Sequence, residues 1–82
     1  MSRYTFTTVG KDGKAYFPSK PLVGKFVGAG LLDFEWTEDI TKAITWNDEQ
    51  TVETVAIEFC DSVIVEISDK DPKHGVVIKT LE

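Results

Sequence analysis

The chain has 82 residues, of which 41% are hydrophobic and 28% are charged, and its formal net charge is −5. This length allows one hydrophobic core and the composition excludes an intrinsically disordered chain, so we expect a single domain over residues 1–82. The one cysteine, Cys60, excludes an intramolecular disulfide. The sequence has no recognisable signal peptide and no apolar run of about 18 residues, which predicts a soluble cytoplasmic protein that does not enter a membrane.

Charge is distributed unevenly along the chain. Residues 1–32 contain five basic residues and one acid, whereas residues 33–69 contain eleven acids and one lysine. Residues 70–82 contain three lysines and two acids. This asymmetry bears on solubility and on the choice of partner, and it carries no information about the fold.

The first two predicted strands form a hairpin. Residues 3–9 alternate aromatic with polar side chains, which indicates a half-buried strand, and the β pattern resumes after residue 14. An Asp-Gly turn at residues 12–13 would join the strands through a two-residue loop and place Val9 opposite Tyr16. A four-residue loop over residues 10–13 is the alternative, because the shorter loop sets two lysines against each other.

Prolines and glycines interrupt the next segment. Pro18 and Pro21 are expected to end the hairpin, since proline cannot donate a hydrogen bond to a sheet. Residues 24–30 contain three glycines and a lysine, but they lack residues that a phosphate-binding loop or a dinucleotide fingerprint requires. Residues 28–30 therefore predict a bulge or sharp bend within a strand, or a close crossing of two backbones.

Residues 31–36 alternate apolar with acidic side chains and predict a strand with one face in the core. Residues 37–46 fit two structures. Apolar residues at helical spacing, with Thr37 as N-cap, favour a short helix, whereas three threonines and two isoleucines favour extended structure. We expect the helix, followed by a polar loop over residues 47–50.

The strongest β periodicity lies in residues 51–68 and predicts an antiparallel hairpin. A three-residue loop over residues 60–62 would keep apolar residues opposite one another on one face, and one long strand bent at a bulge is the alternative. A polar turn over residues 69–75 and a last strand over residues 76–81 complete the chain. Five or six strands with at most one short helix imply a mostly β fold, with an α+β fold also open, built as a small barrel or a curled antiparallel sheet.

No constellation of side chains in the sequence indicates catalysis or a metal site. His74 is the only histidine, and nothing in the spacing brings it to Cys60 as a nucleophilic pair. Asp69, Asp71 and His74 do not match the spacing of a calcium loop. We therefore expect no enzymatic activity, no bound metal and no cofactor.

The acidic middle of the chain predicts a protein-binding surface. Carboxylates from separate segments would form one face if the predicted hairpin over residues 51–68 lies beside the strand over residues 31–36. Such a face can dock on a basic groove of another protein and steer the association. The predicted binding residues are Asp33, Glu35, Glu38, Asp39, Glu58, Glu66 and Trp36.

The sequence leaves three hypotheses for the function of the chain. The first is a non-enzymatic protein-binding module, such as a phage-type inhibitor that docks its acidic face on a host or competitor protein. The second is a structural subunit of a homo-oligomer or larger assembly, for example a virion, because a thin core, an exposed sheet edge and two tryptophans suit burial against other subunits. The third is a single-stranded nucleic-acid binder of OB-like type, which the net negative charge disfavours.

Overall fold

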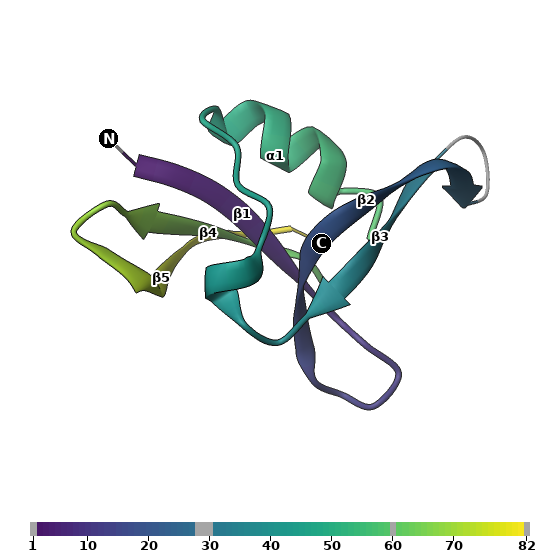
Figure 1. Cartoon of the computed structure of the whole chain (residues 1–82), viewed down its shortest axis with the longest axis horizontal. Coiled ribbons are helices and arrows are strands. Elements are labelled where there is room, and N and C mark those ends of the chain that lie inside the picture. Colours follow the sequence, from purple (N-terminus) through teal and green to yellow (C-terminus); the bar gives the residue numbers. More distant parts are fainter. Residues whose placement is uncertain (1, 28–30, 60, 82) are drawn as a thin grey trace.

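A computed structural model of the chain describes residues 2–27, 31–59 and 61–81, with the backbone alone described in residues 21–27 and 31–33 (Figure 1). These residues form one antiparallel sheet of five strands in the order β3-β2-β1-β4-β5, together with one α-helix and one short 3-10 helix. The predicted mostly β fold is confirmed as a curled antiparallel sheet with one helix, and the sheet does not close into a barrel. The elements are β1 (Ser2–Val9), β2 (Ala15–Val27), β3 (Leu31–Thr37), η1 (Ile40–Lys42), α1 (Glu49–Ala56), β4 (Val63–Ser68) and β5 (Asp71–Thr80).

Phe6, in the central strand β1, is the centre of the hydrophobic core. Its side chain is 0% exposed, and its ring lies 5.6 to 6.1 Å from the rings of Phe34, Trp36, Trp46 and Phe59. These centroid distances are typical of favourable edge-to-face and stacked aromatic pairs. Helix α1 packs against β1 and adds two buried apolar side chains to this core (Figure 1). The core thus ties together β1, β3, α1 and the segment that joins them.

The β1–β2 hairpin has a register one residue away from both predicted registers. Gly13 adopts φ 82°, and its N–H donates to the carbonyl of Gly10 at 3.0 Å. The N–H of Gly10 donates to the carbonyl of Lys14 at 2.9 Å, so the loop contains three residues with a left-handed glycine at its end. Both predicted loops are therefore wrong, and the observed partners are Thr8 with Tyr16 and Val9 with Ala15.

Pro18 and Pro21 do not end β2, so the prediction that these prolines end the hairpin strand is wrong. Pairing with β1 stops at Tyr16, but the strand continues through Pro18 to Val27 and pairs with β3 instead. Proline lacks only the N–H donor, and the carbonyl of Pro18 accepts a hydrogen bond of 2.7 Å from the N–H of Ile44. Residues 28–30, where a bulge, bend or crossing was predicted, lie outside the described residues.

The predicted helix over residues 37–46 is also wrong. Only η1 is helical there, and Asp39 rather than Thr37 caps it, with Oδ1 accepting a hydrogen bond of 2.9 Å from the N–H of Thr41. The chain then becomes extended, and Trp46 exchanges two backbone hydrogen bonds of 2.8 Å with Tyr4. This segment pairs with β1 where β2 has turned away, so tertiary pairing decides its conformation.

The predicted hairpin over residues 51–68 is half right, because β4 is a strand but the first half forms α1. Asp48 caps this helix, and its Oδ1 accepts a hydrogen bond of 3.2 Å from the N–H of Gln50. The polar loop predicted over residues 47–50 is therefore limited to residues 47–48, because residues 49–50 begin α1. Val52 and Ala56 are four residues apart and fully buried, as one face of a helix requires. Ser62 ends the connection, since its buried Oγ donates to the carbonyl of Ala56 at 2.7 Å.

The predicted last strand is confirmed as part of β5, which forms one edge of the sheet. The polar turn predicted over residues 69–75 is too long, because β5 already begins at Asp71. Gly75 lies where β5 crosses close to buried side chains. A Cβ at this position would overlap Cγ1 of Val65 and would lie 2.8 Å from Cδ1 of Ile40. The absence of a side chain therefore allows Ile40 of η1 and Val65 of β4 to approach the backbone of β5 closely.

We predict that Gly75→Ala lowers the free energy of unfolding by about 1–3 kcal/mol, because the added methyl group overpacks a site that has no space for it. Urea unfolding followed by tryptophan fluorescence measures this change. Val76→Ala is the matched control, since Val76 is the next residue of β5 and is 65% exposed. Its expected effect is within about 0.5 kcal/mol. Equal stability of Gly75→Ala and wild type would contradict the close packing.

Candidate functional site

The structure divides the predicted acidic residues between separate parts of the surface. Glu35 is exposed on β3, and Glu38 follows this strand with its Oε1 3.9 Å from Nζ of Lys14. Asp39 caps η1, and the hydrogen bonds from Thr41 lower the pKa of its carboxyl group. These residues are close in sequence at one edge of the sheet, and we call Glu35, Glu38 and Asp39 the β3 acidic group.

The other predicted residues do not join this group. Glu66 lies on β4, three strands from β3, which corresponds to about 14 Å at ordinary strand spacing. Glu58 is exposed in the turn after α1 rather than on a hairpin strand. Trp36 is half-buried in the aromatic core around Phe6. The side chain of Asp33 lies outside the described residues, although its backbone is part of β3.

A second acidic group, which the sequence did not predict, surrounds Tyr4. Burial raises the pKa of Tyr4, and the carboxylates of Glu66, Glu49 and Asp48 raise it further. Glu66 pairs directly with Tyr4 across the β1–β4 ladder, while the other two acids belong to the start of α1. An acid at the N-cap followed by another in the first turn is a signature of a helix start, and it would have indicated this group.

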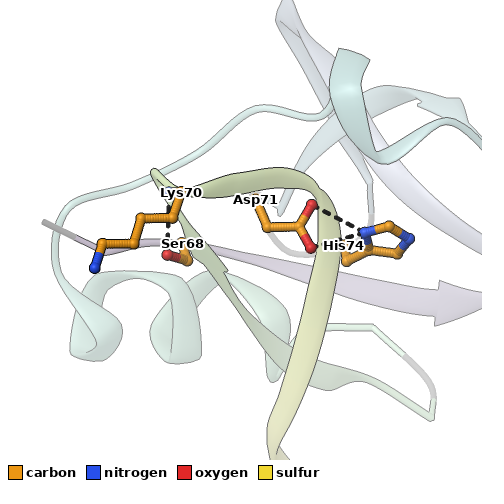
Figure 2. Close-up of polar contacts among 4 residues, drawn as sticks. All are labelled: Ser68, Lys70, Asp71 and His74. Atoms are coloured by element: carbon orange, nitrogen blue, oxygen red, sulfur yellow. Dashed lines mark hydrogen bonds and ion pairs between the residues drawn. The ribbon is translucent and has the colours of Figure 1, made fainter.

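The β4–β5 hairpin contains a close contact between the His74 ring and the Asp71 carboxylate (Figure 2). Nδ1 of His74 is 2.9 Å from both carboxylate oxygens of Asp71, and both side chains are exposed at the start of β5. In the preceding turn Oγ of Ser68 accepts a hydrogen bond of 3.2 Å from the N–H of Lys70. Across the described ranges, no cluster of three or more His, Cys, Asp or Glu side chains is arranged to hold a metal ion. Cys60 lies outside those ranges, so the Cys60–His74 pair considered in the sequence is not described.

A small cavity of about 160 Å³ separates the η1 segment from the sheet. Nε of Arg3 is buried at this place and has no hydrogen-bond partner, although it lies 3.6 Å from Oδ1 of Asp69. The volume is below the roughly 300–1,000 Å³ of typical small-molecule sites, and Asp69 balances the charge of Arg3. The cavity is lined by Arg3, Ile40, Thr41, Ala43, Thr45, Ile67, Pro72 and Lys73.

Strand β5 is the most exposed element that the structure describes. All ten of its residues are exposed, and they include three consecutive apolar side chains. Val76 is 65% exposed, Val77 is 58% exposed and Ile78 is 39% exposed. One side of β5 pairs with β4, and within the described residues the other side has no neighbouring strand. The sequence predicted an exposed edge but did not identify the strand that forms it.

Comparison with known proteins does not identify this surface, because no protein family, no curated protein and no solved structure matches the chain. The helices in the described part of the chain are too short and too polar to span a membrane.

The Tyr16–Asp12 hydrogen bond at the β1–β2 loop can be tested by a pH titration. The hydroxyl of Tyr16 donates a hydrogen bond to Asp12, and this bond together with burial raises the pKa of Tyr16 to about 12. An unfolded tyrosine titrates near 10.0, so the stability that this bond contributes is fully present below pH 10 and is lost as the pH rises to about 12. We predict that an ultraviolet titration of the native protein finds Tyr16 ionising near pH 12.

Two variants serve as controls for this titration. Asp12→Ala is expected to lower the pKa of Tyr16 toward 10.0 and to leave Tyr4 unchanged, since Asp12 is not among the groups that act on Tyr4. Glu66→Gln is expected to lower the pKa of Tyr4 and not that of Tyr16. If Asp12→Ala leaves the pKa values of both Tyr16 and Tyr4 unchanged, the hydrogen bond from Tyr16 to Asp12 does not raise the pKa of Tyr16.

Proposed function

We propose that the chain is a non-enzymatic protein-binding module that binds its partner by strand addition to β5. The observation that carries this proposal is the exposure of β5, with apolar Val76, Val77 and Ile78 next to each other at an edge of the sheet. An unpaired edge strand presents a row of N–H and C=O groups that a partner strand can satisfy. A partner strand would also cover these three side chains, which water now surrounds.

The contacts of the ionisable residues support a binding role over a catalytic one. The carboxylates of Asp12, Asp39 and Asp48 accept hydrogen bonds from backbone N–H groups of loops and helix starts. The ring of His74 contacts the carboxylate of Asp71 at the surface of a hairpin. Each of these interactions stabilises local backbone structure. A chain with one cysteine suits a reducing compartment, and we therefore place the module in the cytoplasm.

The acidic residues add an electrostatic contribution to the proposed binding. The β3 acidic group is exposed near the other edge of the sheet, and it is suited to attract a basic partner and increase the rate of association. Inhibition of a host or competitor protein, as expected from the acidic sequence, would use this group. Strand addition at β5 has stronger structural support, because exposed apolar side chains and an unpaired backbone edge occur together there.

Photocrosslinking tests this proposal directly. Val77 and Ile57 are replaced in turn by a photoreactive phenylalanine derivative, and each protein is irradiated in cell extract. The two positions are matched, since Val77 is 58% exposed and Ile57 is 59% exposed, but Ile57 follows α1 and lies outside the sheet. We predict protein adducts, with this chain or another, from position 77 at several times the yield from position 57. Equal yields from the two positions, or adducts from neither, would contradict the proposal.

A further inference from the structure

We propose that the partner strand is β3 of a second copy of this chain, so that copies join head to tail through opposite edges of their sheets. This inference rests on the proposed function of β5. The sheet has β3 at one edge and β5 at the other, and both are strands of seven or more residues. A second copy therefore offers a β3 edge to which β5 of the first copy can pair.

The charges of the two edges are opposite. The turn before β5 and the strand itself, residues 69–80, carry three lysines and two aspartates. Strand β3 and the turn after it, residues 31–39, carry four acids and no basic residue. Two lysines lie beside these acids, since Lys20 of β2 is the register partner of Glu35 and Nζ of Lys14 is 3.9 Å from Oε1 of Glu38. Pairing of β5 with β5 or of β3 with β3 would bring like charges together, whereas pairing of β5 with β3 brings opposite charges together. Charge therefore favours pairing of β5 with β3 of the second copy and disfavours pairing of two identical strands.

The order of residues along each strand selects an antiparallel arrangement. Lys70 in the turn before β5 and Lys73 in the strand come first, and the apolar residues 76–78 follow. In β3 the apolar residues 31–32 come first, and the acids become more frequent toward residue 39. Antiparallel pairing therefore sets the basic end against the acidic end and apolar residues against apolar residues. A parallel pair would set the apolar end of β5 against the acids.

A bulge and Pro72 interrupt the basic end of β5, so contact there is through side chains and the backbone pairing is confined to the residues after the bulge. Gly75 pairs with Ile67 and Asp71 pairs with Ser68, so residues 72–74 bulge from the ladder with β4. The Lys73 side chain in this bulge is exposed, and so is that of Glu35 on β3. Lys79, by contrast, forms a 2.7 Å ion pair with Glu53 of α1, so its charge is less available to an acid of a partner. Lys70 and Lys73 are the cations we assign to the contact, with Glu35 and Glu38 facing them. Glu38 is also paired with Lys14, but this 3.9 Å contact joins two exposed side chains and is weaker than the 2.7 Å pair of Lys79 with Glu53.

The resulting assembly is heterologous, because two different surfaces meet at each contact. Heterologous contacts repeat and generate rings or open filaments rather than closed dimers. Antiparallel addition also reverses the direction of each successive sheet, so α1 lies on alternating faces of the extended sheet. A contact between two short strands buries a small area, and association of this kind is weak and depends on concentration.

Sedimentation velocity of the purified full chain tests the inference. We expect the weight-average sedimentation coefficient of the wild type to rise with concentration and to fall again at high salt. Two charge-reversed variants are compared with it, Lys70→Glu/Lys73→Glu and Glu35→Lys/Glu38→Lys. Each alone is expected to need at least about tenfold higher concentration to associate, since like charges then meet at both edges. Native tryptophan fluorescence and urea unfolding verify that both variants fold.

Mixing the two variants gives the decisive comparison. In an equimolar mixture, each edge of one variant meets an oppositely charged edge of the other, so association is expected to return to the wild-type range. A wild-type chain that stays monomeric at every concentration would overturn the inference, and so would variants that associate like the wild type or a mixture that does not associate. If the chain is monomeric while position 77 still crosslinks to another protein, only the second-copy partner is wrong and the proposed function stands.

Discussion

The packing of aromatic rings around Phe6 is the interaction on which the rest of this structure depends. Phe6 belongs to β1, and its partners come from β3, from the extended segment at Trp46 and from the turn after α1. A chain of 82 residues has material for one core, so this cluster fixes which elements lie inside. Because β1 is central and pairs with both β2 and β4, β3 and β5 are left as the two edges.

The position of β5 follows from this arrangement, and with it the proposed role. The helix covers the sheet above β1, and β5 is held mainly by its ladder with β4 and by contacts of Gly75 and Lys79. Its apolar residues 76–78 therefore stay at the surface, where they add nothing to the core. Lysines on an edge strand oppose pairing with an identical strand, and acids on β3 do the same at the other edge. Complementary edges of this kind restrict which strands can be added to the sheet.

Local patterns in the sequence predict some of these elements and fail for others on physical grounds. Residues 3–9 and 31–36 have clear alternation and form strands, and the last strand is also predicted. Residues 51–59 satisfy helical spacing and alternation at once, and the cap at Asp48 decides for the helix. The conformation around Trp46 depends on a backbone pair with Tyr4, which is distant in sequence. The candidate edge was beyond prediction for the same reason, since strand order arises from contacts between elements and not within them.

Amide hydrogen exchange followed by NMR over a range of protein concentrations tests whether β5 is an edge outside the aromatic core, whose side away from β4 becomes protected only when a second strand pairs with it. We expect slow exchange in β1 and β4 at every concentration, because these strands pair on both sides or adjoin the core. In dilute solution β5 should exchange faster than β4, and protection of β5 and β3 should rise together as the concentration increases. Protection of β5 equal to that of β4 in dilute solution, or no change with concentration at either edge, would contradict this expectation.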